Sequence, residues 1–224
     1  MSVTSIFSVL RQLRITLKKC HLELDRVNSA PTISSRKEYA LHFISCAPLD
    51  MAKCMFIDES GFNLHLHRTQ GRSVKGHRAK IMLPTIRGRN VTLIAAINSR
   101  GVIHTKIVED STCNGKKFCV FMTELMLELQ KNSYYGGSWL IMDNARIHKT
   151  QELKDILHGY RYDMQFLSPY SYMMNPIENV FSKVKAEVRN MLAERGNEYS
   201  LKEFIKAGIR KVIPDDCQLC NEYV

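Results

Sequence analysis

The chain has 224 residues, 45% of them hydrophobic, which is enough to bury the core of one main domain with a small appendage. Its 32 Lys and Arg outnumber its 22 Asp and Glu, and the formal charge of +10 favours polyanionic partners. Membrane insertion is not supported, because the longest apolar run, Val91–Ile97, is far shorter than the roughly 20 residues of a transmembrane helix.

The sequence indicates an intracellular protein, which would be nuclear in a eukaryotic cell. No signal peptide is evident, because Arg11 and Arg14 closely follow a short apolar start without a small-residue cleavage site. Seven cysteines without repeated spacing argue against a disulfide framework, and Cys217 and Cys220 form only half of a zinc-site pattern.

Residues 2–19 are predicted to form a short basic helix that carries Arg11, Arg14, Lys18 and Lys19. Such a helix either enters a DNA groove or packs on the domain with its charges in solvent, and the pattern alone favours the second arrangement. Residues 20–35, which include Pro31, are predicted to be a linker, and a second helix is predicted over 35–45.

Two apolar runs are predicted to be buried strands, and each ends in a carboxylate. Residues 54–57 precede Asp58, and residues 139–142 precede Asp143. Adjacent strands would place both acids at one edge of the sheet, where open α/β sheets carry their chemistry. An alternative for Asp143 is that it only caps a helix beginning near His148.

The remaining predicted elements complete an α/β domain. They are a hairpin of strands 91–98 and 102–108, helices 116–131, 150–160 and 201–212, a strand 164–167, and a loop 168–174. A further helix starts at Asn175-Pro176, with Asn175 as N-cap, Pro176 first and Glu178 third. Capping and catalysis both favour an acid at Glu178, so the spacing does not choose between them.

The stretch between Ser60 and Val108 contains no acidic residue and is predicted to form a positive wall beside the carboxylates. Cations there would hold a phosphodiester backbone, although such stretches are usually solvated surface. The predicted DNA-binding residues in it are Arg68, Arg72, Lys75, Arg78, Lys80, Arg87 and Arg89.

Asp58, Asp143 and Glu178 together are the donor set that magnesium prefers. Mg²⁺ takes hard oxygen ligands and is normally held by a few carboxylates and a substrate phosphate. Two such ions about 4 Å apart can bind the attacking and leaving oxygens of an in-line displacement.

At these residues the sequence resembles mariner-type (Tc/mariner) transposases of the DDE superfamily. Three ordered blocks carry the resemblance, and 34 residues separate Asp143 from Glu178, the interval for which this family is known. The blocks are Phe56–Phe62 (FIDESGF), Met142–His148 (MDNARIH) and Ser168–Asn179 (SPYSYMMNPIEN).

The resemblance implies a ribonuclease-H-like α/β fold, a mixed sheet flanked by helices, with a small helical N-terminal remnant. It implies that Asp58 bridges two Mg²⁺ or Mn²⁺ ions, and that Asp143 and Glu178 each hold one. It places Asn144, His148 and Asn175 near the site. Residues 1–50 would be the remnant of a helix-turn-helix DNA-binding region plus linker, and 51–224 the catalytic domain.

The implied function is a DNA endonuclease and strand transferase that acts on double-stranded DNA, both transposon ends and target, and the resemblance allows a homodimer. One alternative is a catalytically idle, truncated or domesticated DNA-binding relic. Another is hydrolysis of the RNA strand of a hybrid, which uses the same fold.

Overall fold

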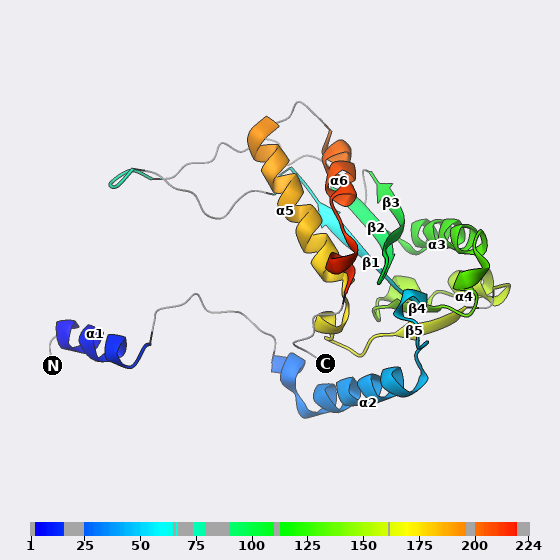
Figure 1. Ribbon diagram of the computed structural model, residues 1–224, viewed down its shortest axis with the longest axis horizontal. Helices are drawn as coiled ribbons and strands as arrows, with labels where there is room; N and C mark the ends of the chain where they lie inside the picture. The colour runs from blue at the N-terminus through cyan, green and yellow to red at the C-terminus, as the bar shows by residue number, and fades with distance from the viewer. Residues whose placement is uncertain are drawn as a thin grey trace.

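The computed structural model describes residues 3–15, 25–64, 66, 74–78, 90–109, 113–160, 162–195 and 200–218. Its centre is a five-stranded mixed sheet in the order β3-β2-β1-β4-β5 (Figure 1). The first three strands pair antiparallel, whereas β4 and β5 continue the sheet in parallel from β1. The strands are β1 (Cys54–Phe62), β2 (Val91–Asn98), β3 (Gly101–Val108), β4 (Trp139–Met142) and β5 (Asp163–Phe166).

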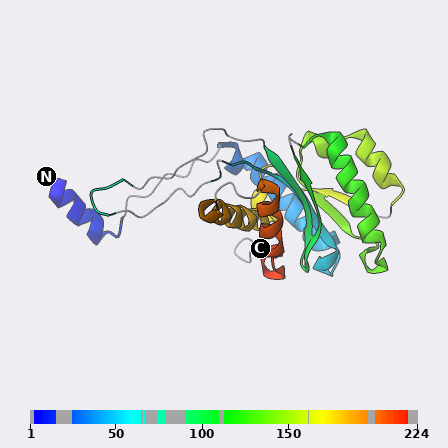
Figure 2. The same cartoon turned by 90° about the horizontal axis from the view of Figure 1, so that it is seen from above.

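Helices cover both faces of this sheet, which confirms the predicted α/β class. In Figure 2 the green helices α3 and α4 lie on one side of the strands, and the brown-orange α5 and red-orange α6 lie on the other. Every residue of β2 is buried, because both of its faces are covered. The helices are α3 (Gly115–Gln130), α4 (Gln151–His158), α5 (Ile177–Arg195) and α6 (Leu201–Arg210).

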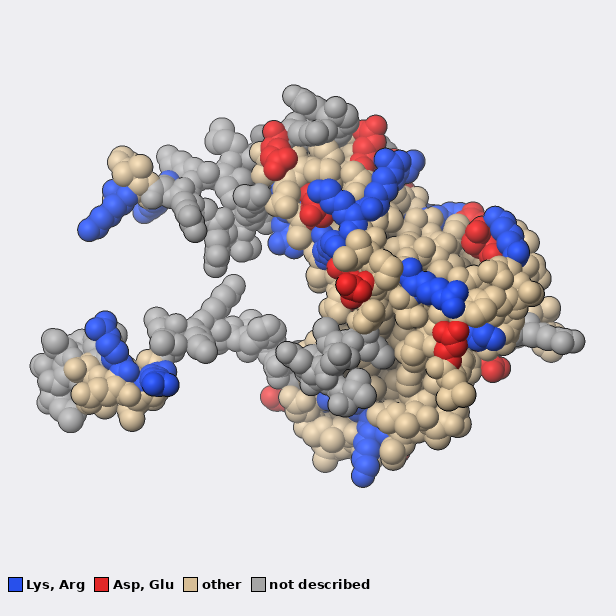
Figure 3. Space-filling model, in the orientation of Figure 1, with Lys and Arg blue, Asp and Glu red and all other residues tan. Residues whose placement is uncertain are grey.

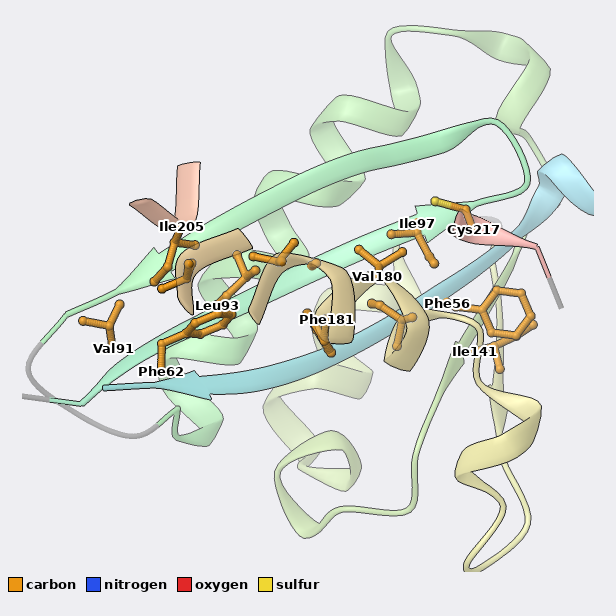
Figure 4. Close-up of a cluster of buried hydrophobic side chains, with 14 of the residues drawn as sticks. Phe56, Phe62, Val91, Leu93, Ile97, Ile141, Val180, Phe181, Ile205 and Cys217 are labelled. Carbon is orange, nitrogen blue, oxygen red and sulfur yellow. The ribbon is translucent and has the colours of Figure 1, made fainter. Parts of the chain in front are cut away.

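The apolar side chains form one cluster on each face of the sheet. Figure 4 shows the α5 face, where Phe56, Leu93 and Ile141 of the strands meet Val180 and Phe181 of α5. On the other face, Met55, Ile57 and Leu140 pack with the apolar side of α3. Successive residues of a strand point to opposite faces, so even-numbered residues of β1 lie on the α5 face and odd-numbered residues on the α3 face.

The first helix, α1 (Val3–Gln12), is shorter than the predicted helix 2–19. It ends in a turn in which Arg14 has a φ of 54°, a conformation that stops a right-handed helix. Lys18 and Lys19 lie outside the described residues.

The predicted linker 20–35 is wrong from residue 30 onward. A 3₁₀ turn occupies Asp25–Asn28, and α2 then runs over Ala30–Cys46. Pro31 is in the first turn of α2, where the missing N–H of proline costs nothing, so it starts the helix instead of interrupting it. His42 and Phe43 of α2 pack against the ring of Trp139 at the start of β4.

The strand predicted over 54–57 continues through Asp58 to Phe62. Its second half is held by antiparallel pairing with β2, in which Asp58 lies opposite Ala95 and Phe62 opposite Val91. Pairing with β4, however, ends at Ile57 and Met142. Asp58 therefore lies where the neighbouring strand ends, not where its own strand ends.

The other predicted elements are confirmed with boundaries shifted by a few residues. The turn between β2 and β3 uses Gly101 at a φ of 130°, a region that favours glycine. No helix among the described ranges is both long enough and apolar enough to cross a membrane.

Candidate active site

Asp58 and Asp143 are brought together by the parallel pairing of β1 and β4. The last paired residues are Ile57 and Met142, so the two aspartates are the next residues along adjacent strands. The predicted meeting of these two carboxylates at one edge is therefore seen in the register. Their charges interact, since Asp143 is one of the groups that raise the pKa of Asp58.

The carboxyl group of Asp58 is partly buried and surrounded by other acids. Burial and the charges of Glu59, Asp143 and Glu178 raise its pKa from 3.8 to about 7, against a backbone hydrogen bond that lowers it. Oδ1 accepts that bond from the Glu59 amide at 2.7 Å, and Oδ2 accepts one from Asn175 Nδ2 at 3.1 Å.

The predicted N-cap role of Asn175 is wrong. A capping side chain accepts a hydrogen bond from the first turn through its oxygen, but Asn175 Oδ1 is buried with no hydrogen-bond partner among the described residues. Its amide nitrogen binds Asp58 instead. Glu178, in the first turn of α5, is exposed and close enough to act on Asp58 through its charge.

Asp143 is held by two donors on one oxygen. Oδ1 accepts from the Ala145 amide at 2.9 Å and forms an ion pair with His148 Nδ1 at 2.8 Å. The same Nδ1 also lies 3.3 Å from the main-chain carbonyl oxygen of Asp143. The His148 bond holds the pKa of Asp143 below its ordinary value, and partial burial opposes this effect. The alternative role as a helix cap is wrong, because the Thr150 hydroxyl caps α4 by accepting from the Leu153 amide.

His148 is completely buried between two carboxylates. Nδ1 binds Asp143, and Nε2 lies 3.1 and 3.2 Å from the two carboxylate oxygens of Glu59. The ring also packs on Phe118 with 4.4 Å between centroids. Burial disfavours the charged imidazole, but the hydrogen bonds to Asp143 and Glu59 outweigh it and raise the pKa of His148 from 6.5 to about 10.

Glu59 was not among the residues predicted from the sequence. The available signal was strand alternation, because a second acid directly after Asp58 must point to the opposite face of β1. That face carries Phe118 and His148, so Glu59 meets an imidazole where Asp58 meets other acids.

Asn144 connects the ends of two strands. Its amide nitrogen donates to the Leu167 carbonyl after β5, and its Oδ1 accepts from Lys149 Nζ at 2.5 Å. Lys149, another residue that the sequence prediction missed, also lies 4.9 Å from the ring centre of Phe166, and its charge helps to lower the pKa of Asp143.

Of the predicted DNA-binding residues, Arg11, Arg14, Lys75 and Arg78 are described and exposed. Figure 3 shows Lys and Arg interspersed with Asp and Glu over the described part of this face, and not gathered in one continuous patch. Seven others lie outside the described residues: Lys18, Lys19, Arg68, Arg72, Lys80, Arg87 and Arg89.

The donor chemistry of the site fits a divalent cation. Asp58 is crowded by like charges that a cation would offset, and the buried Asn175 Oδ1 is an acceptor without a donor in the described part of the chain. Within the described ranges, no three His, Cys, Asp or Glu side chains gather closely enough to hold one ion together. Asp58 and Asp143 instead accept hydrogen bonds from protein donors.

Known proteins with this architecture include transposases. The chain is 18% identical to the mariner Mos1 paired end complex with Mg, covering 96% of this chain and 68% of that one at a TM-score of 0.68. The Mos1 transposase paired-end complex with the left transposon end is 17% identical, with 96% of this chain and 68% of that chain covered and a TM-score of 0.66. The catalytic domain of Mos1 mariner transposase is 16% identical, with 89% of this chain and 94% of that chain covered and a TM-score of 0.52. These likenesses confirm the predicted ribonuclease-H-like fold.

No curated protein sequence matches the chain at a significant level. A family model described as DDE superfamily endonuclease, however, matches residues 53–198, a range that includes all three acids. By this match the chain belongs to the DDE superfamily endonucleases.

Proposed function

We propose that the protein is a divalent-metal-dependent DNA endonuclease and strand transferase of the transposase type. The observation that carries this proposal is the position of Asp58 and Asp143 directly after the last paired residues of β1 and β4, with Glu178 close enough to act on Asp58. Family membership supports the same reaction class.

In this proposal Asp58 would hold two Mg²⁺ or Mn²⁺ ions, and Asp143 and Glu178 would each hold one. When bound, the ions supply activation of a water or 3′-hydroxyl and neutralise the departing oxygen. The Mos1 structures include paired end complexes with Mg and with Mn, which supports the choice of metal.

The chain's own residues prepare the carboxylates for this role. Asn175 fixes one oxygen of Asp58 through its amide nitrogen. His148 and the Ala145 amide both bind Oδ1 of Asp143, so that Oδ2 is the oxygen that we expect to ligate a metal. These contacts limit how far either carboxylate can rotate.

We propose double-stranded DNA as the substrate, both as transposon end and as target. Lys149 lies beside Asp143 and is suited to contact a phosphate near the acids. Arg11, Arg14, Lys75 and Arg78 are exposed cations for more distant phosphates. The Mos1 proteins were solved with a transposon end and in a strand transfer complex, which supports this substrate class.

Residues 1–50 are proposed to belong to a DNA-binding region plus linker, and 51–224 to be the catalytic domain. A homodimer is compatible with this division. Sedimentation of the purified chain with and without a DNA duplex measures the oligomeric state directly.

Nicking of supercoiled plasmid with and without magnesium tests the proposed reaction. We expect Asp143→Asn and Glu178→Gln to abolish magnesium-dependent nicking while the circular dichroism spectrum stays that of the wild type. Glu124→Gln is the matched control, because Glu124 is a carboxylate paired with His104 and Lys106 away from these acids. If either site variant nicks at the wild-type rate, the assigned roles are wrong.

A second candidate is a DNA-binding protein that no longer catalyses. It is favoured by the absence, in the described ranges, of three metal-ligating side chains gathered at one point. Calorimetric titration with Mn²⁺ in the presence of DNA separates the two, because the idle protein should bind no ion there. A parallel assay on duplex DNA and on an RNA–DNA hybrid separates DNA cleavage from hydrolysis of the RNA strand.

A further inference from the structure

We propose that Glu59 is a positioning residue, which fixes the carboxylate of Asp143 by holding His148 between them. The inference rests on the proposed function, because it assigns a purpose to the orientation of a metal-binding carboxylate. Glu59 lies within the first of the three sequence blocks, directly after Asp58, but was not among the predicted site residues.

Polar contacts run in a continuous chain from Glu59 through His148 to Asp143. His148 Nε2 is 3.1 Å from Glu59 Oε1, and His148 Nδ1 forms an ion pair with Asp143 Oδ1 at 2.8 Å. Nδ1 also lies 3.3 Å from the main-chain carbonyl oxygen of Asp143, so two acceptors of one residue face this nitrogen. Ionised carboxylates only accept hydrogen bonds, so the imidazole must donate from both nitrogens. The His148 side chain has no exposed surface, and only 13% of the Glu59 side chain is exposed. Water therefore does not easily replace the bond between His148 and Glu59.

Asp143 depends on this chain because no regular element holds it. It follows the last residue of β4 and precedes a turn, and 49% of its side chain is exposed. The backbone amide of Ala145 and the His148 ring are its hydrogen-bond donors among the described residues. Loss of the His148 contact would leave the carboxylate freer to rotate.

The orientation of His148 is set from the side away from Asp143. Phe118 of α3 packs on the ring and limits its tilt, and Glu59 fixes its rotation by engaging Nε2. Outer partners of this kind commonly change metal affinity or activity by 10- to 100-fold when removed. The dipeptide Asp58-Glu59 would thus supply a ligand on one face of β1 and support for a second ligand on the other.

The test measures Mn²⁺ binding to the full chain by calorimetry, and nicking of plasmid DNA as kcat and KM. The variants are Glu59→Gln, which keeps the shape but removes the charge, and His148→Asn, which keeps a donor for Asp143 but cannot reach Glu59. Their double variant is the third protein, and Glu124→Gln is the control. Glu124 also binds a histidine, but it does so at the edge strand β3.

We expect Glu59→Gln to weaken Mn²⁺ binding by about 10- to 100-fold and to lower kcat with little change in KM for DNA. The double variant should bind Mn²⁺ as His148→Asn does, because Glu59 acts through His148. The control variant Glu124→Gln should have the Mn²⁺ affinity, kcat and KM of the wild type. If Glu59→Gln does not fold, Glu59→Asp, which retains the charge on a shorter side chain, should show the same direction of change.

The inference is overturned if the wild type binds Mn²⁺ and the folded Glu59 variant binds it equally well. It is also overturned if the two single effects add in the double variant, since Glu59 would then act independently of His148. A wild-type protein that binds no Mn²⁺ with DNA present contradicts the proposed function itself, and this inference with it.

Discussion

Two histidine–glutamate pairs use the same chemistry in different surroundings. His104 of β3 is 3.4 Å from Glu124 of α3 and packs on Phe121, whereas His148 is 3.1 Å from Glu59 and packs on Phe118. In the first pair, 24% of the His104 side chain and 40% of the Glu124 side chain are exposed. In the second, the His148 side chain is fully buried and 13% of the Glu59 side chain is exposed. Both histidines thus lie against a phenylalanine of α3, and burial is the main difference.

Burial decides how much each pair can contribute. An exposed ion pair gains little, because water competes for both partners and salt screens them. A buried pair costs desolvation, but removing one partner leaves a charge without compensation. The buried pair therefore suits the alignment of a carboxylate such as Asp143. The half-buried pair of Glu124, which also binds Lys106 at 2.5 Å, contributes less.

The largest expected effect is that of His148→Ala. Removing this ring leaves Glu59 and Asp143 without their shared donor and opens a cavity beside Phe118, so we expect a loss of about 3–5 kcal/mol in the free energy of unfolding. His104→Ala should cost less, because the His104–Glu124 pair is more open to solvent. Urea denaturation of both variants measures the difference, and equal losses would contradict the comparison.

Next in size is an alkaline loss of stability. The pKa of His148 is raised from 6.5 to about 10, so its contribution is fully present below pH 6.5 and is lost as the pH rises towards 10. The difference in unfolding free energy between wild type and His148→Asn should shrink over this range in buffer with chelator. A difference that is constant from pH 6.5 to 10 would exclude a charged His148.

A smaller effect is expected for Glu124→Gln. Burial raises the pKa of Glu124, but the hydrogen bonds from Lys106 and His104 outweigh it and lower the pKa below the ordinary 4.5. The contribution is therefore present above pH 4.5 and is lost as the pH falls further. We expect at most about 1 kcal/mol near neutral pH, measured by urea denaturation, with no difference between the variants in strong acid.

The smallest effect is the response of each pair to salt. Raising NaCl from about 0.1 M to about 1 M shortens the Debye length from about 10 Å to about 3 Å. The stability difference between wild type and Glu124→Gln should then disappear, and that for Glu59→Gln should persist. Thermal unfolding at the two salt concentrations measures both stability differences. If salt reduces the two differences equally, the two pairs do not differ in burial as described.

The sequence was informative where a structural signal is local. Apolar runs predicted the cores of β1, β2 and β4. The carboxylates after residues 57 and 142 predicted that Asp58 and Asp143 lie next to each other on adjacent strands. The interval between Asp143 and Glu178 pointed to the family that the domain match confirms.

Local signals failed where a distant partner decides. The polar stretch Asp58–Gly61 does not look like a strand, and it is one because β2 pairs with it. Asn175 fits every local rule for an N-cap, yet its amide binds Asp58, 117 positions away in the sequence. Glu59 was missed for the same reason, because its partner His148 is 89 positions away.

The length of β4 and its register with β1 fix the distance along the sheet between Asp58 and Asp143. Each strand residue advances about 3.3 Å, so two residues inserted before Asp143 would carry it about 7 Å along β1, beyond the reach of an ion held by Asp58. A single inserted residue would turn it toward the opposite face. We therefore expect natural variation in length to occur in the segments joining β4 to its neighbours, and not within Trp139–Met142.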